Sequence, residues 1–254
     1  MAKDTSLETK KKKNGWMAHF EALRKGKFNQ LSKFIPNMMA DIPEQEKLII
    51  LIDIVGFSKS STREQVYTIY VFQQYLLSQI ITSKIIFKSK IHINQFIPTG
   101  DGCYIIADKC ELQPAMEFLI ALVSGFSHAN ETDEEGLSLR VSALLGSCVP
   151  FMDMAHHFNY VGEGMNEAAR ILTCGQAVLE QHYIAEHSDA AETTPEKLTK
   201  DAKHFSRNCL FLGDSFACVI DQFADKCSNI YTFRDVADKH GITRNITVMQ
   251  NVGV

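Results

Sequence analysis

The chain has 254 residues, of which 45% are hydrophobic and 22% are charged, and its formal net charge is −4. These values are typical of a soluble globular protein with a full hydrophobic core, and they argue against a nucleic-acid-binding body. The seven cysteines include no Cys-x-x-Cys pair, which argues against both a zinc site and a disulfide framework.

The first 44 residues are expected to form an extension. The basic run from Lys10 to Lys13 predicts a disordered tail, and the apolar spacing from Trp16 to Phe34 predicts an amphipathic helix. This helix could pack on its own domain, mediate dimer contacts or lie on a membrane. The chain shows no signal peptide, and no apolar run approaches the roughly 20 residues of a membrane span. We therefore expect a cytoplasmic protein without a membrane contact.

The next element is an apolar run from Leu48 to Asp53, whose length predicts a buried strand. An aspartate in such a run is costly unless it is paired, so Asp53 should hold a cation or several hydrogen-bond donors. From Arg63 to about residue 86 the spacing predicts a helix, and we expect Tyr67 and Tyr70 to join its core face. The other expected core positions of that helix are Val66, Ile69, Phe72, Leu76, Leu77, Ile80 and Ile81.

Residues 91–97 and 103–107 predict a β-hairpin that holds Asp101 at its tip, between two glycines. Glycine lets the backbone approach a ligand closely, and exposed amides can cradle phosphate. Asp53 and Asp101 together would form an oxygen-only site suited to Mg²⁺ or Mn²⁺. The alternative is that each aspartate only caps a turn.

The middle of the chain predicts a helix over 112–127 and a strand over 137–145 that Gly146 breaks. A further helix follows Gly162 and places Asn166 and Arg170 on one face, because they are four residues apart. Arginine can clamp charge that develops on a phosphate, and asparagine can orient a sugar hydroxyl. The alternative is a surface asparagine and an arginine in a salt bridge.

The last third is less informative. Residues 186–203 are polar and predict a surface insertion, and the part beyond them offers one clear strand, over 229–233, and a short tail. Strands that alternate with long helices, with a hairpin among them, favour an α+β sandwich or an α/β one, with helices packed on one sheet.

Together these stretches resemble the class III nucleotidyl cyclase catalytic domain, the adenylyl and guanylyl cyclase family. The resemblance is clear over about residues 45–175 and continues to about 235 by strand pattern alone. It implies a single α+β catalytic domain over 45–254, with an antiparallel-rich sheet. Four motifs carry it: Asp53-Ile54-Val55-Gly56-Phe57-Ser58, Thr99-Gly100-Asp101, Arg140 to Gly146 with Ser142 in place of a glycine, and Val161-Gly162 followed by Asn166-Glu167-Ala168-Ala169-Arg170.

The resemblance implies roles for these residues. Asp53, Asp101 and the Ile54 carbonyl would bind two divalent cations, Mn²⁺ or Mg²⁺, and the amides of Val55, Gly56, Phe57 and Ser58 would receive the triphosphate. Asn166 and Arg170 would come from the other protomer of a head-to-tail homodimer and stabilise the transition state. The reaction would be attack of the ribose 3′-hydroxyl on the α-phosphorus, with release of pyrophosphate. For the triphosphate lysine of the family, Lys203, Arg207 and Lys226 are candidates.

Two departures concern the base of the substrate. Adenylyl cyclases carry Lys and Asp at the two base-reading positions, and guanylyl cyclases carry Glu and Cys, whereas this chain has Ile97 and Asn159. Isoleucine cannot bond a purine edge, whereas one asparagine amide is enough for the smaller edge of uracil or cytosine. The chain thus looks like the stand-alone pyrimidine cyclases of bacterial anti-phage (Pycsar) signalling, which make cUMP or cCMP as a second messenger. UTP and CTP are not distinguished.

Two alternatives remain at this point. An adenylyl cyclase making cAMP could contact adenine through Tyr160 or through backbone groups. A degenerate cyclase domain could bind nucleotide and regulate a partner without turnover.

Overall fold

The computed structural model describes residues 43–86, 91–131, 137–153, 157–188 and 194–252. The basic tail and the amphipathic helix expected before Pro43 lie outside the described residues. Of the helices within these ranges, none combines the length and the hydropathy that crossing a bilayer requires.

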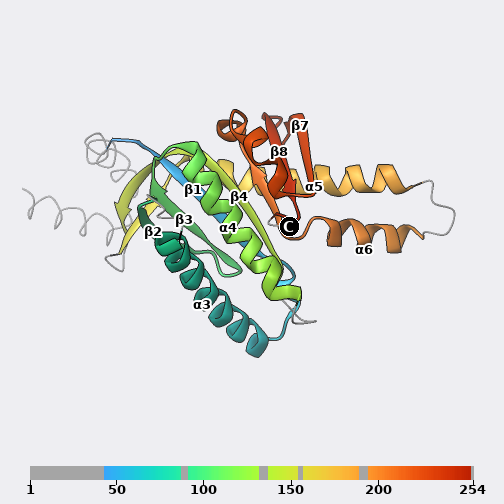
Figure 1. The fold of residues 1–254 in the computed structure, drawn as a ribbon, viewed down its shortest axis with the longest axis horizontal. Helices are drawn as coiled ribbons and strands as arrows, with labels where there is room; N and C mark the ends of the chain where they lie inside the picture. The colour runs from blue at the N-terminus through green and yellow to red at the C-terminus, as the bar shows by residue number, and fades with distance from the viewer. Residues whose placement is uncertain (1–42, 87–90, 132–136, 154–156, 189–193, 253–254) are drawn as a thin grey trace, which may run out of the picture. The chain divides into compact units, whose positions relative to one another are not determined.

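A mixed sheet lies at the centre of this part of the chain (Figure 1). Its order is β2-β3-β1-β4-β6-β8-β7, and β5 pairs with β4 outside this path. The β4–β6 pair is parallel and the other pairs are antiparallel. The strands are β1 (Gln45–Ile54), β2 (Ile93–Pro98), β3 (Gly102–Asp108), β4 (Leu139–Met152), β5 (Phe158–Val161), β6 (Cys209–Leu212), β7 (Asn229–Ala237) and β8 (Thr243–Gln250).

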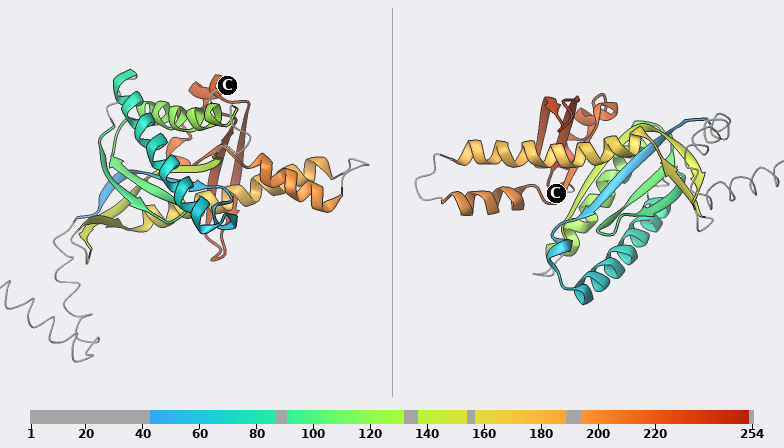
Figure 2. Two further views of the ribbon diagram at one scale, coloured as in Figure 1. Left: turned by 90° about the horizontal axis from the view of Figure 1, so that it is seen from below. Right: turned by 180° about the vertical axis from the view of Figure 1, so that it is seen from behind.

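Helices cover both faces of this sheet, as the views in Figures 1 and 2 show. They are α3 (Thr62–Ile86), α4 (Leu112–Glu131), α5 (Glu163–His187) and α6 (Pro195–Phe205), with short 3₁₀ helices η1 (Phe57–Lys59), η2 (Asp214–Phe216) and η3 (Ile220–Lys226). The predicted α+β architecture, with an antiparallel-rich sheet and helices packed on it, is confirmed.

The central strand β1 explains why the sheet needs helices on both faces. Its side chains alternate, with Leu48, Ile50 and Ile52 in the core beneath α3 and α4, and Ile49 and Leu51 in the core beneath α5. All five are at most 7% exposed. A strand that is apolar on both faces must be covered on both.

The prediction of which α3 residues face the core is partly wrong. Tyr67 and Tyr70 are 71% and 63% exposed, and the stripe that packs inward is Phe72, Leu76 and Ile80. Apolar residues occupy more than one stripe of this long helix, and the single packed face buries only one of them. Three further expected core residues, Val66, Leu77 and Ile81, are also exposed.

The second half of the chain also departs from prediction. Gly146 does not break β4, which continues to Met152. At this glycine α5 lies directly on the strand, because a Cβ on Gly146 would lie 2.8 Å from the Gly164 Cα. The expected surface insertion is largely helical: α5 continues to His187, and α6 then forms an antiparallel pair with it that projects from the sheet (Figure 2). The strands β5, β6 and β8 were not predicted.

Candidate active site

The β-sheet register brings Asp53 and Asp101 to one place. Asp53 is paired with Gly102 across β1 and β3, and the Ile54 amide donates to the Asp101 carbonyl at 2.8 Å. A Cβ at Gly102 would lie 1.9 Å from the Ile52 carbonyl oxygen, so only glycine allows this approach. The predicted hairpin with Asp101 at its tip is therefore confirmed, and its tip is fixed against the end of β1.

The Asp53 carboxylate lies in an unusual electrostatic environment. Its side chain is 19% exposed. Burial raises the pKa of Asp53, the Arg140 guanidinium opposes that rise, and the charge of Asp101 adds to it. The two carboxylates therefore repel each other, and a cation between them would relieve the repulsion.

Arg140 is a member of this site that the sequence did not assign. It lies opposite Asp53 in the β1–β4 register, and its Nε donates to Asp53 Oδ2 at 2.9 Å. Its Nη2 donates to the same Oδ2, and its Nη1 donates to Gln176 Oε1. The sequence marks Arg140 only as the start of a strand motif, since its place opposite Asp53 depends on a pairing between residues far apart in the chain.

The turn after β1 has the form expected of a phosphate cradle, with one exception. Gly56 has a φ of 80° and leads into η1. The Val55 amide donates to the Ser138 carbonyl at 2.9 Å, so it is already engaged. The amides of Gly56, Phe57 and Ser58 remain the predicted phosphate donors.

The two residues predicted to face the base lie on β2 and β5, which contact each other. Ile97 is half-buried and packs in the core on the α5 side, where Tyr104 and Tyr160 also pack. Asn159 is half-buried on β5, and its Oδ1 accepts from the Tyr160 amide at 2.8 Å. This bond orients the Asn159 amide, and its Nδ2, a hydrogen-bond donor, is available to a ligand.

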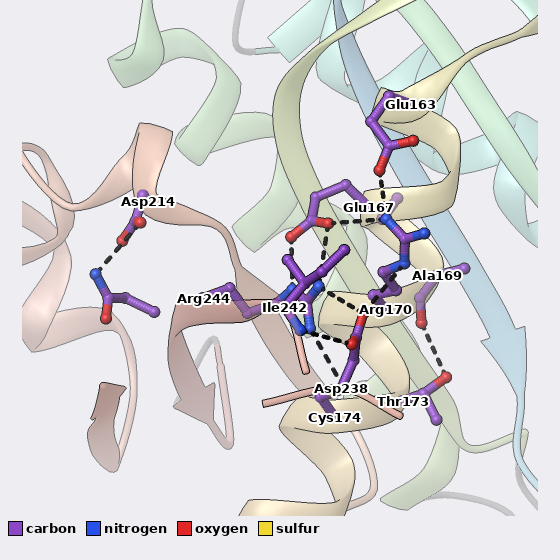
Figure 3. A network of polar contacts seen from close by, with 12 residues as sticks. Glu163, Glu167, Ala169, Arg170, Thr173, Cys174, Asp214, Asp238, Ile242 and Arg244 are labelled. Atoms are coloured by element: carbon purple, nitrogen blue, oxygen red, sulfur yellow. Dashed lines mark hydrogen bonds and ion pairs between the residues drawn. The ribbon is translucent and has the colours of Figure 1, made fainter. Parts of the chain in front are cut away.

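Asn166 and Arg170 both lie on α5, and Asn166 is exposed. Figure 3 shows Arg170 between carboxylates of its own chain: Glu163, Glu167 and Asp238. The Arg170 side chain is 26% exposed, and none of these three carboxylates belongs to the Asp53 site. Within the described part of one chain, the structure does not bring Arg170 and Asp53 into contact.

Arg244 and Asp238 complete the network in Figure 3, and neither was predicted from the sequence. Arg244 Nε donates to Glu167 at 2.7 Å, and its Nη2 donates to Asp238 at 3.0 Å. The Arg244 and Asp238 side chains are 5% and 4% exposed. This pair attaches the β7–β8 turn to α5, next to Arg170.

Asp238 should make the free energy of unfolding depend on pH in the acidic range. Burial alone would raise the pKa of Asp238, but the amides of Ile242 and His240 and the Arg244 guanidinium hold it at about 2. The stabilisation is complete above the ordinary value of 3.8 and is lost as the pH falls toward 2. In denaturant unfolding we expect Asp238→Asn to be less stable than wild type at neutral pH, and the difference to shrink steadily below pH 3.8. Asp235→Asn, at an exposed position of the same hairpin, is the control; an equal difference at every pH would contradict the assignment.

The three candidates for a triphosphate lysine lie in different places. Lys203 is on α6, Arg207 follows that helix, and Lys226 ends η3. All three are exposed, and Lys226 pairs with Asp225 at 3.0 Å. No contact in the described residues connects any of them to Asp53.

The donor set at Asp53 and Asp101 fits one class of metal. Among the described residues no group of three or more His, Cys, Asp or Glu side chains could hold an ion by itself. Mg²⁺ instead binds through one or two carboxylates and completes its shell with water and substrate phosphates. Two neighbouring carboxylates beside the Gly56 turn match that pattern, and they do not match a zinc site.

Comparisons with known proteins show that the fold of this chain is similar to that of solved structures. No family model matches the sequence, and no curated protein matches it. The structure is similar to the catalytic core of a rhodopsin-guanylyl cyclase with converted specificity, in complex with ATPαS, with a TM-score of 0.52 and 13% identity over 84% of this chain and 99% of that one. It is also similar to the guanylate cyclase domain of RhGC from Catenaria anguillulae, in complex with GTP, with a TM-score of 0.51 and 13% identity over 83% of this chain and 99% of that one.

A third similar structure is a bacterial light-regulated adenylyl cyclase, with a TM-score of 0.52 and 12% identity, over 99% of this chain and 68% of that one. At such identities the likeness concerns the fold. The described chain thus has the α+β fold of the adenylyl and guanylyl cyclase catalytic domains.

Proposed function

We propose that this protein is a nucleotidyl cyclase, which converts a nucleoside triphosphate to the 3′,5′-cyclic mononucleotide and pyrophosphate. The observation that carries the proposal is the junction of Asp53 and Asp101, two mutually repelling carboxylates on adjoining backbone in a cyclase-type sheet. Structural aspartates that only cap turns do not require this arrangement, and the Arg140 guanidinium pairs with only one of the two carboxylates.

Each residue of the site has a role in this proposal. Asp53, Asp101 and the Ile54 carbonyl would hold two divalent cations, Mn²⁺ or Mg²⁺, whose charge lowers the pKa of the ribose 3′-hydroxyl and offsets charge at the α-phosphorus. The amides of Gly56, Phe57 and Ser58 orient the triphosphate. The 3′-oxygen forms a bond to the α-phosphorus, and the β- and γ-phosphates leave together as pyrophosphate. Asn166 orients the ribose, and Arg170 stabilises the negative charge of the transition state.

The active form in this proposal is a head-to-tail homodimer with two shared sites. Arg170 is held on the side of α5 that carries the β7–β8 turn, so a second copy would supply the arginine that stabilises the transition state at the Asp53 site. Three apolar side chains on the β4–β5 ribbon support an interface between copies. Met152, Phe158 and Val161 are 54%, 64% and 51% exposed, a cost that a second copy would remove.

The substrate we propose is a pyrimidine nucleotide. Ile97 packs in an apolar cluster and offers no polar group to a purine edge. Asn159 presents the Nδ2 donor, which suits the O4 acceptor of uracil better than the N4 amine of cytosine. We therefore place UTP ahead of CTP. The product, cUMP, would be a second messenger, and the resemblance of the motifs to stand-alone pyrimidine cyclases connects it to anti-phage defence.

One observation favours a different function, that of a nucleotide-binding regulatory domain. Arg170 is already engaged by the carboxylates of Glu163, Glu167 and Asp238, as it would be in a purely structural role. Release of pyrophosphate separates the two functions. The cyclase proposal requires release that depends on Mn²⁺ and on nucleotide, whereas nucleotide binding without pyrophosphate release would support the regulatory domain.

A further inference from the structure

A chain of polar side chains runs from the Asp53 site into the α5–α6 pair. Arg140 Nη1 donates to the side-chain oxygen of Gln176. Gln176 Nε2 donates to Glu180 Oε1 at 2.7 Å, and Ser206 Oγ donates to the same oxygen at 2.9 Å. The chain thus connects β4, α5 and the residue that follows α6.

The members of this chain are partly or fully buried. The Asp53 and Arg140 side chains are each 19% exposed, Gln176 and Glu180 are half-buried, and Ser206 is 1% exposed. Buried polar groups need partners, and a connected network holds its members in one arrangement. The orientation of Arg140 is therefore set by more than its pairing with Asp53.

The way Arg140 meets Asp53 is specific. A guanidinium usually grips a carboxylate with two parallel hydrogen bonds, one to each oxygen. Here Nε and Nη2 of Arg140 both donate to Oδ2 of Asp53, while Nη1 is held by Gln176. Arg140 therefore leaves Oδ1 of Asp53 free for another partner.

Glu180 sets the direction of the Gln176 amide. An ionised carboxylate only accepts hydrogen bonds, so Gln176 must turn its Nε2 toward Glu180 and its oxygen toward Arg140. Without Glu180 the amide could reverse, and a donor would then face the guanidinium.

We propose that Gln176 and Glu180 are positioning residues for the metal site: they hold Arg140 on Oδ2 of Asp53 and so keep Oδ1 open to a divalent cation. The inference rests on the proposed cyclase function and adds to it a route from the α5–α6 pair to the metal. Without this restraint the Arg140 fork turns to grip both oxygens of Asp53 and competes with the cation.

The test is Mn²⁺ binding to the full chain without nucleotide, measured from the electron paramagnetic resonance signal of free Mn²⁺. We expect Gln176→Ala to weaken binding by about tenfold, the usual scale for residues that orient metal ligands. Glu180→Gln should weaken it in the same direction. Gln181→Ala, at an exposed position of the same helix, is the matched control and should bind as wild type. Thermal unfolding shows whether each variant folds.

A double variant separates positioning from a merely structural role. Gln176→Glu combined with Glu180→Gln exchanges the amide and the carboxylate, so that the introduced carboxylate accepts from Arg140 and the introduced amide donates to that carboxylate. We expect this pair to restore Mn²⁺ binding to within about twofold of wild type, and to restore the Mn²⁺ concentration that half-activates turnover. Weakened folding without a change in Mn²⁺ affinity would overturn the inference, and so would wild-type affinity in both Gln176→Ala and Glu180→Gln.

Failure of the positioning role can be told apart from failure of the cyclase proposal, because Mn²⁺ binding and pyrophosphate release are measured separately. If the wild type binds Mn²⁺ but releases no pyrophosphate from any nucleotide, the cyclase function is refuted, and the shift in Gln176→Ala still decides the positioning role.

Discussion

Replacing either Asp53 or Asp101 with alanine is expected to lower turnover by on the order of 10³-fold, because each variant removes a carboxylate that, in the proposed function, holds the metal charge at the reacting phosphate. Both side chains lie on the adjoining ends of β1 and the β2–β3 hairpin, so the two losses should be of similar size. The measurement is pyrophosphate release at saturating Mn²⁺ and nucleotide.

The controls for this prediction are structural. Light scattering should show the same dimer for both variants and wild type, since neither residue lies on the β4–β5 ribbon. Asp221→Ala removes an exposed carboxylate on η3 and should leave turnover unchanged. A near-wild-type rate in Asp53→Ala or in Asp101→Ala would refute the two-metal assignment.

Mixing two inactive variants should restore activity. If Asp53 and Arg170 act across the dimer, Asp53→Ala and Arg170→Ala each inactivate both sites of a homodimer. After exchange of subunits at equal amounts, half of the dimers are mixed and each mixed dimer has one intact site, so activity should recover to about a quarter of wild type. Pyrophosphate release before and after mixing measures this recovery.

The matched control is a mixture of Asp53→Ala with Asp101→Ala. In the proposal these residues serve the same site from the same protomer, so each site of a mixed dimer lacks one of the two carboxylates and no activity should be recovered. A second control mixes the double variant Asp53→Ala/Arg170→Ala with wild type. The double-variant protomer contributes a defective residue to each of the two shared sites, so these mixed dimers have no intact site. No recovery on mixing Asp53→Ala with Arg170→Ala would place Arg170 in the same site as its own Asp53, or outside the site.

The central part of the site could be predicted from sequence because its signals are local. The run from Leu48 to Asp53 is apolar on both faces, which a buried strand requires. The two glycines around Asp101 mark a tight tip, and the structure shows that Gly102 is required by the approach to Ile52. Both signals depend only on residues that are adjacent in the chain, so the sequence alone is enough to predict them.

Arg140, Gln176 and Arg244 could not be found in this way. Arg140 belongs to the site only through the pairing of β1 with β4, across 87 positions of the chain. Gln176 meets it because α5 runs back along β4, where Ser142 donates to the Ala168 carbonyl at 2.8 Å. That hydrogen bond also shows how serine replaces the glycine expected at this position: its hydroxyl is used to fasten the helix.

The errors in secondary structure have physical causes as well. The short strand β6 has four buried residues, too few to show a period. Tyr67 and Tyr70 were expected in the core because aromatic residues usually pack, but the face of α3 that meets the rest of the fold is set by Phe72. Periodicity identifies a helix, whereas the choice between two apolar stripes depends on the surface it packs against.

The most direct test of the proposed function is to incubate the purified protein with Mn²⁺ and each of ATP, GTP, CTP and UTP separately, and to identify the products by mass. We predict a 3′,5′-cyclic pyrimidine mononucleotide, with UTP the better substrate because Asn159 presents a donor. A cyclic purine as the main product would retain the cyclase and refute the roles given to Ile97 and Asn159. No cyclic product from any of the four nucleotides would contradict the central claim.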